Sequence, residues 1–491
     1  MKYNFLYIIA AIILFASCGN NIRISKKTQE NPAIYPDYKN VTVPVNIAPL
    51  DFCVTAKGEY GLIMEGGGET VSIKADNDGN FEIPQSKWQK MLQASKGGEL
   101  KMTVCRKTNN GWEGMKPFAI HVADDSIDPY LAYRLIPPGY GHWREMGIYQ
   151  RCLENYDETP IMQNKLTGYN CMNCHSFPAR DPSRMVMHMR ARNGGTLIYD
   201  NEKLEKLNTK TPETMSALVY PYWHPNGKYI AFSVNKTAQY FFMNHPNRIE
   251  VYDSNSDVVV YDVQKHEIIS TPMLMDSTRY ETFPCFSPDG TELYFCSAAV
   301  VDTLPLHFRQ AHYNLCRISF DVRKGTFGKS IETLYNAHAD SMSVSFPRIS
   351  PDGRYLCFTR HGFGTFSIWH KDADLWMMDL KTKRVLPITA ANSPDVESYH
   401  SWSSNSRWIV FSSRRGDGLY TRPYITYIDR RGVARKPFLL PQRKPKQYYE
   451  EQMCSYNIPE LIKGKVEMNR YKAAKFMRED KGTDISFREG L

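Results

Sequence analysis

The 491-residue sequence lacks the long apolar segments and the catalytic signatures of several large protein classes. After the first twenty residues no run reaches 18 consecutive apolar residues, which excludes a protein with several membrane-spanning helices. The sequence contains no Gly-x-Ser-x-Gly nucleophile motif and no His-Glu-x-x-His zinc motif. The stretch from Gly325 to Ser330 imitates a phosphate-binding loop, but Arg323 stands where that loop needs its first glycine. These absences argue against a serine hydrolase, a zinc protease and a nucleotide-binding enzyme.

A large excess of one charge is also missing. The formal net charge is +9, and the basic residues near the C-terminus alternate with acidic ones, which indicates a solvated surface and no nucleic-acid partner. Aromatic residues, by contrast, make up 13% of the chain, with 31 tyrosines, and this composition favours strands. The length predicts roughly two or three domains.

Residues 1–17 are predicted to be an export signal. Lys2 precedes an apolar run over residues 5–15, which is too short to span a bilayer, and Ala16, Ser17 and Cys18 follow. Small residues directly before a cysteine resemble the signal of bacterial lipoproteins. The resemblance implies cleavage before Cys18, lipidation of Cys18, and a periplasm-facing anchor, with the outer membrane as the expected location. The alternative is an ordinary signal peptide with a chance cysteine.

The next two segments are predicted to be a tether and a small β domain. Residues 18–40 are polar and without periodicity, as in a flexible tether. Short β-favouring runs over 41–124 predict a β-sandwich with one short helix over 86–95, and Asp76–Gly79 is predicted to be a hairpin turn. Cys53 and Cys105 lie in two of the expected strands and are candidates for a disulfide.

After residue 210 the chain repeats one short phrase, in which Pro, Asp or Asn, and Gly suit a turn that starts a strand. One such sheet cannot bury its apolar face alone, so the copies must stack. The phrase resembles the TolB-like, WD40-like β-propeller repeat, and the resemblance implies a mainly β protein with a five- or six-bladed propeller over 191–465. The four copies are Trp223–Gly227, Phe286–Gly290, Ile349–Gly353 and Trp402–Ser406.

Several further residues of this region are interpreted as structural. Four cysteines fall in or beside the expected strands and are interpreted as small buried hydrophobes: Cys285, Cys296, Cys316 and Cys357. His224 and His400 lie near the repeat turns, where they either line the mouth of the propeller or serve the structure. Residues 466–491 are predicted to be a basic tail that is partly helical.

Residues 125–190 are predicted to link the two domains, and they hold the sharpest chemical motif. Cys171 and Cys174, followed by His175, have the spacing of a c-type haem attachment site, in which two thiols bind one porphyrin and the imidazole binds its iron. A zinc ribbon needs a second cysteine pair and a thioredoxin-type pair needs a βαβ context, and neither is present. An ordinary disulfide or a chance pair stays open.

The sixth iron ligand is predicted from the residues that follow the motif, with His188 preferred, Met187 or Met189 second and His142 third. The segment 128–149, which is dense in aromatic residues and prolines, is either a wall of the haem pocket or an extended linker.

Taken whole, the chain resembles a family of bacterial envelope lipoproteins that join a Cys-x-x-Cys-His segment to a TolB-like propeller. The resemblance implies a cytochrome-type role and establishes no reaction; we expect one covalent haem c and the transfer of single electrons to or from an envelope partner. Two alternatives remain: a haem-free propeller scaffold for protein–protein interaction, and a haem enzyme or sensor with an open sixth site.

Overall fold

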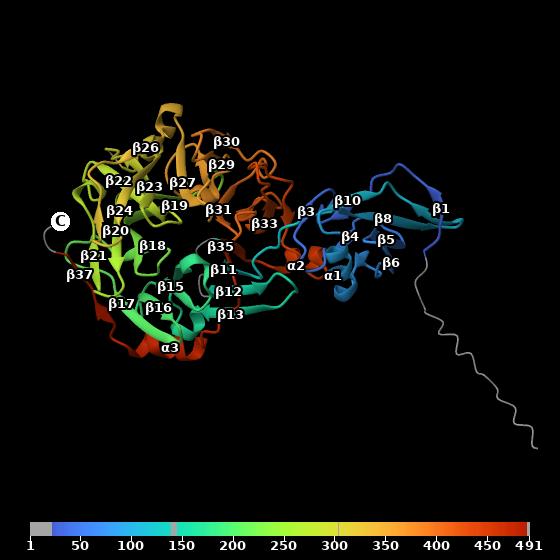
Figure 1. The fold of residues 1–491 in the computed structure, drawn as a ribbon, viewed down its shortest axis with the longest axis horizontal. Coiled ribbons are helices and arrows are strands. Elements are labelled where there is room, and N and C mark those ends of the chain that lie inside the picture. The colour runs from blue at the N-terminus through green and yellow to red at the C-terminus, as the bar shows by residue number, and fades with distance from the viewer. Residues whose placement is uncertain (1–21, 139–144, 303, 489–491) are drawn as a thin grey trace, which may run out of the picture.

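The computed structural model describes residues 22–138, 145–302 and 304–488. Strands dominate, and the three helices within these ranges are short, so the prediction of a mainly β protein is confirmed. Figure 1 shows a large body of radially arranged sheets with a smaller unit beside it. Within the described ranges, no helix has the length and apolar character needed to cross a membrane.

The smaller unit has two unequal sheets and one helix. The rings of Phe52 and Phe118, with centroids 6.3 Å apart, join the two sheets. Helix α1 (Gln85–Ala94) lies where the sequence predicts a helix, and it buries Trp88 and Leu92 on one face. The large sheet contains β1 (Ile24–Lys27), β3 (Thr42–Val43), β5 (Tyr60–Gly66), β6 (Glu69–Lys74), β8 (Glu99–Thr108), β9 (Gly111–Gly114) and β10 (Phe118–Val122); the small one contains β2 (Ile34–Tyr35), β4 (Phe52–Val54) and β7 (Asn80–Phe81).

The described part of the predicted tether belongs to this unit. Strand β1 pairs in parallel with β9, and β2 pairs with β4. Tyr38 is fully buried, and its hydroxyl donates a hydrogen bond to the carbonyl of Leu439 at 3.2 Å. The prediction of a tether over 22–40 is therefore wrong, because strands this short carry no periodicity of their own and form only against distant partners.

The suggested disulfide between Cys53 and Cys105 does not form, and both thiols are free and buried. Cys105 packs on the face of the large sheet that carries Trp112, whereas its neighbour Val104 faces the main core of the unit. Alternation along β8 therefore turns the Cys105 thiol away from β4, which holds Cys53.

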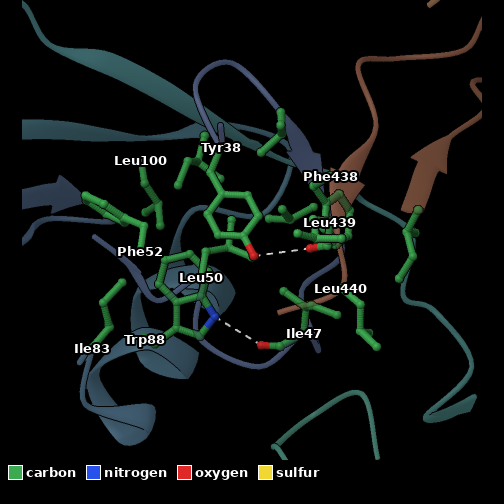
Figure 2. Packing of buried hydrophobic residues seen from close by; sticks show 14 of the residues in the cluster. Tyr38, Ile47, Leu50, Phe52, Ile83, Trp88, Leu100, Phe438, Leu439 and Leu440 are labelled. Carbon is green, nitrogen blue, oxygen red and sulfur yellow. Dashed lines mark hydrogen bonds between the residues drawn. The ribbon is translucent and has the colours of Figure 1, made fainter. Parts of the chain in front are cut away.

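One apolar core joins the smaller unit to the large body. Figure 2 shows Tyr38 and Trp88 packed beside Phe438 and Leu439 of β34 (Phe438–Leu439). The indole N–H of Trp88 donates a hydrogen bond to the carbonyl of Ile47 at 3.0 Å, so the buried ring has a polar partner. Because residues of both parts fill this core, the two parts pack as one body.

The large body consists of six sheets of four or five strands, and the innermost strands of neighbouring sheets contact one another around a central axis. The last long strand, β35 (Ser455–Ile462), pairs with the first, β11 (Tyr130–Ile136), and so closes the ring. This closure leaves no exposed sheet edge between the first and last segments of the ring. The arrangement is that of a β-propeller.

From the axis outward, the first sheet contains β35, β11, β12 (Gly147–Cys152) and β13 (Glu158–Gln163); the second β14 (Met172–Ser176), β15 (Arg184–Met189), β16 (Gly195–Asp200), β17 (Lys203–Asn208) and β36 (Thr483–Asp484); the third β18 (Leu218–Trp223), β19 (Tyr229–Phe241), β20 (Ile249–Asp262), β21 (Glu267–Ile269) and β37 (Ser486–Phe487). The fourth contains β22 (Arg279–Phe286), β23 (Glu292–Ala299), β24 (Asn314–Asp321), β25 (Thr326–Phe327) and β26 (Glu332–Tyr335); the fifth β27 (Ser343–Ile349), β28 (Tyr355–His361), β29 (Asp374–Asp379) and β30 (Val385–Pro387); the sixth β31 (Glu397–Trp402), β32 (Trp408–Ser413), β33 (Arg422–Tyr427) and β34.

Two predicted boundaries differ from the structure. The segment 125–190, expected to be a linker, supplies the outer three strands of the first sheet and the two inner strands of the second. The expected tail contains helix α3 (Arg470–Glu479), as predicted, but β36 and β37 then pair with outer strands of two sheets. A third helix, α2 (Pro445–Glu451), precedes β35.

The four predicted phrases are turns between the first and second strands of four sheets, as the repeat pattern requires. In one of them the Asp289 carboxylate accepts hydrogen bonds from the Ser287 hydroxyl and the Thr291 backbone N–H. The following Gly290 has φ +75°, a left-handed conformation that favours glycine. The four thiols interpreted as buried hydrophobes are free and buried, as expected.

The glycines of two of these turns, Gly353 and Gly290, allow a matched test of what the left-handed conformation and the local packing each contribute to stability. In Gly353→Ala the new methyl group meets nothing within 4 Å, so left-handed backbone strain alone should lower the free energy of unfolding by about 1 kcal/mol. In Gly290→Ala the methyl group would lie 2.1 Å from the His224 ring, which should cost a further ~1–3 kcal/mol. Thermal unfolding of both variants measures the difference, and equal losses would contradict the packing that the structure shows.

Candidate functional site

Each innermost strand of the six sheets has a register shift at the same place. In five of them a non-glycine residue adopts a left-handed φ of 49–54° at this bulge. Four of these residues form an aromatic plug, since the ring centroid of Phe346 lies 4.0 Å from that of Phe283, 4.9 Å from that of Tyr399 and 6.4 Å from that of Tyr220. The bulge also presents one further residue per sheet: His175, Tyr222, Cys285, Arg348, Ser401 and Glu460.

These strands and the turns that follow them surround a cavity of about 280 Å³, which we call the axial cavity. Its walls are aromatic at Tyr222, Trp223 and Trp402. The indole N–H of Trp223 donates to the Ser176 carbonyl and that of Trp402 to the Arg348 carbonyl, so the polar atom of each buried ring has a partner. The residues at the bulge differ from sheet to sheet, whereas the turns repeat. A repeated scaffold with one varied polar position is what a binding site on a propeller requires.

The charged residues of the axial cavity are mostly basic. Arg180, Arg348 and Lys463 line it, together with Glu460. Burial raises the pKa of the Glu460 carboxyl to about 7, although the backbone N–H of Phe177 and the two arginines act in the opposite direction. The Glu460 carboxyl is thus less ionised at neutral pH than an exposed glutamate, and the cavity has more basic than acidic residues.

His175 and Cys174 of the predicted haem motif also line the axial cavity. The His175 side chain is 3% exposed, and neither ring nitrogen has a hydrogen-bond partner among the described residues. Burial, with a smaller effect from the charge of Arg134, lowers the pKa of this imidazole to about 3, so the ring is neutral at neutral pH. The neutral form is the one that binds a metal. Burial raises the pKa of the Cys174 thiol, which is therefore protonated as the structure stands.

Cys171 lies at the edge of this site. Its half-buried side chain packs against a methionine cluster, Met172, Met185, Met187 and Met189, and does not line the axial cavity. The motif lies at the start of β14, where a register shift between Met172 and His175 interrupts the regular alternation of side chains. The structure therefore brings two of the three predicted attachment residues to the cavity.

The predicted sixth ligands are not brought to the cavity. Met187 lies directly opposite His175 across β14 and β15, and therefore on the same face of the sheet, while Met189 lies opposite Met172. Both methionines pack in the methionine cluster and neither lines the axial cavity. His188, the preferred choice, points to the opposite face of the sheet, where its Nδ1 bonds the Thr196 hydroxyl at 3.1 Å. Strand alternation separates His188 from His175. His142 and Cys18 lie outside the described residues.

The two histidines near the repeat turns have different positions. His224 is structural, because its Nδ1 bonds the Asn226 side chain at 2.6 Å and its Nε2 bonds the Gly290 carbonyl at 3.0 Å. His400 lines the axial cavity while its Nε2 bonds the Cys357 carbonyl at 3.0 Å. Among the described residues no group of three or more His, Cys, Asp or Glu side chains has the arrangement of a bare metal-ion site.

The sequence reasoning missed Arg348, Tyr222 and Glu460, although a signal for two of them was present. The residue directly before each repeated phrase lies at the bulge, and this rule finds Tyr222 and Arg348. A fifth, degenerate copy, Ser176–Arg180, also follows His175 directly, with Arg180 in the glycine place at φ +65°. The haem motif thus overlaps a repeat of the propeller.

Comparison with known proteins adds only distant likenesses. No family model and no curated protein matches the chain. Prolyl oligopeptidase B from Galerina marginata aligns over 70% of this chain and 43% of its own length, at 10% identity and a TM-score of 0.36. The periplasmic gluconolactonase PpgL of Pseudomonas aeruginosa aligns over 63% of this chain and 96% of its own, at 13% identity and a TM-score of 0.34. The chain spans less than half the length of the prolyl oligopeptidase, and likenesses this distant carry no conclusion about activity.

Proposed function

We propose that the protein is an envelope lipoprotein that carries one haem c at the axial cavity and passes single electrons to or from an envelope partner. Cys171 and Cys174 would hold the haem by thioether bonds, and His175 would bind its iron. The observation that supports this most strongly is the His175 imidazole, which is buried beside a cavity with both nitrogens unpartnered among the described residues. Burying such a ring without partners costs free energy, which a bound metal centre would offset.

The residues that line the axial cavity have the chemistry that a haem requires. Cys174 and His175 are among the residues that line the space, together with aromatic and basic residues. Covalent attachment at Cys171 additionally requires its side chain to turn from the methionine cluster towards the cavity. When bound, a haem supplies a reversible one-electron couple. The protein's part is to hold the group, exclude water with Trp223 and Trp402, and keep His175 neutral.

The remaining parts of the proposal concern location and architecture. We propose that each of the six sheets is one blade, and that the propeller serves as the docking platform for the redox partner. The lipid on Cys18 would hold the protein at the outer membrane, facing the periplasm.

The absorption spectrum of the full-length protein tests the haem proposal. The protein should be made in cells with an intact cytochrome maturation system and purified from the envelope fraction. A Soret band and a pyridine haemochrome spectrum typical of haem c are expected, at one haem per chain. A colourless protein from such cells would contradict the proposal.

A haem-free docking scaffold is the second candidate, and the position of Cys171 favours it. If Cys171 stays in the methionine cluster, only one thiol faces the cavity and the Cys-x-x-Cys-His spacing has no covalent use. The propeller would then bind an envelope partner without redox chemistry, as its repeats alone permit.

A further inference from the structure

The axial cavity contains two guanidinium groups that form no close ion pair among the described residues, although both act on the Glu460 carboxyl at longer range. Arg180 and Arg348 are both half-buried and line the cavity. In the part of the chain that the structure describes, neither has a carboxylate oxygen within 4.0 Å, whereas Arg317, Arg354, Arg360, Arg407 and Arg415 of the same propeller all form such ion pairs. A partly buried charge without a partner is unfavourable, and an anion entering the cavity would relieve it.

Backbone carbonyls fix both guanidinium groups in place. Arg348 donates from Nη1 to the Pro347 carbonyl at 2.8 Å, and its guanidinium lies 5.0 Å from the ring centroid of Tyr222. Arg180 donates from Nε to the Trp402 carbonyl at 2.7 Å. A guanidinium has five N–H donors in one plane, so each group retains donors suited to a carboxylate.

The acid that lines the cavity does not occupy these donors. The Glu460 carboxyl accepts a hydrogen bond from the Phe177 backbone N–H at 3.2 Å and is more than 4.0 Å from every arginine nitrogen among the described residues. Its pKa of about 7 leaves much of it uncharged at neutral pH. The half-buried ring of Tyr222 completes the site with an aromatic surface against which the apolar part of a ligand can pack.

We infer that the axial cavity is a binding site for an organic carboxylate, whose acid group binds Arg348 and Arg180 and whose apolar body packs against the half-buried Tyr222. Two sources supply this chemistry: the propionate groups of a haem, in which case the inference rests on the proposed function, or a free aromatic carboxylate. The unpaired arginines are a separate observation from the His175 ring, so either proposal can fail alone.

Calorimetric titration of the full-length Cys171→Ala/Cys174→Ala protein tests the inference. The probe is indole-3-acetate, and the matched control is indole-3-ethanol, which has the same ring and no charge. The carboxylate is expected to bind at least about tenfold more tightly, because charge-assisted hydrogen bonds to arginine are the strong ones. Equal affinities, or binding of neither compound, would overturn the inference.

Arginine variants show which residues cause the preference for indole-3-acetate over indole-3-ethanol. Arg348→Gln is expected to abolish this preference, and Arg180→Gln is expected to reduce it. The second variant keeps the test possible if the first does not fold. Arg360→Gln is the control, since Arg360 stacks on Trp376 and pairs with Asp340 outside the cavity. An unchanged preference in folded Arg348→Gln protein would overturn the inference.

The unsubstituted protein separates the two sources. If it carries haem and binds indole-3-acetate only after both cysteines are removed, the site belongs to the propionates. If it binds indole-3-acetate as isolated, the site takes a free carboxylate. A colourless protein that still prefers the carboxylate would end the haem proposal and leave this inference standing.

Discussion

Replacement of Cys171 and Cys174 by alanine together is expected to give a folded protein with no covalently bound haem. The change removes both sulfur atoms to which a porphyrin could be attached. The fold should survive, because β14 pairs with β15 through backbone hydrogen bonds that alanine also makes. Each replacement removes a single sulfur atom from a side chain, and the Cys171 side chain is half-buried. The measurement is the haem stain of the denatured protein together with the Soret absorbance of the native one.

The control is Cys53→Ala/Cys105→Ala, which removes two free, buried thiols of the smaller unit. This pair should keep its full haem content, at some cost in stability. Haem that remains covalently bound to the Cys171→Ala/Cys174→Ala protein would show that the attachment site lies elsewhere in the chain.

Replacement of His175 by phenylalanine is expected to stabilise the haem-free protein by about 1–3 kcal/mol. The change removes two buried nitrogens that have no hydrogen-bond partner among the described residues, and an aromatic ring of similar shape keeps the edge-to-face contact with Phe177 at 6.0 Å. A gain in stability when a residue is removed is a sign that the residue serves function. In the haem-loaded protein the same change removes the axial nitrogen, so the spectrum should lose the features of a histidine-bound iron.

His224→Phe is the matched control for this prediction. Both nitrogens of His224 are hydrogen-bonded, so the same chemical change should destabilise the protein by about 1–3 kcal/mol. Thermal unfolding of the two variants in the Cys171→Ala/Cys174→Ala background gives the comparison. Equal destabilisation in both would mean that His175 is an ordinary structural histidine.

Sequence reasoning found the propeller because its turns are local. The phrase Phe286–Gly290 contains a hydrogen-bond acceptor in Asp289, a restricted φ at its proline and a left-handed glycine at Gly290. These residues predict the turn without any knowledge of the rest of the chain. The short helix α1 was also predictable, since Trp88, Met91 and Leu92 lie on one helical face.

The strands β11–β15 of the first and second sheets were missed for a physical reason. Strand β11 completes its sheet with β35, more than three hundred residues away, and no local pattern records such a pairing. The degenerate turn Ser176–Arg180 keeps the proline but has Arg180 in the glycine place, so it escaped the comparison with the other copies. The segment 125–190 therefore resembled a linker.

The candidate site was predictable only in part. The spacing of Cys171, Cys174 and His175 identifies a chemical possibility, and the structure places two of these residues at the axial cavity. The choice of His188 depended on its distance along the chain, whereas alternation in β15 decides the face on which it lies. Arg348 and Glu460 come from separate sheets and line one cavity only when the ring closes.

Mass spectrometry of the peptide that holds the motif tests the central claim most directly. Trypsin should release Leu166–Arg180, which contains Cys171, Cys174 and His175. From protein matured in cells with a working haem-attachment system, we expect this peptide to carry the added mass of one haem and to absorb in the Soret region. The same peptide with two unmodified or merely disulfide-linked cysteines would contradict the account.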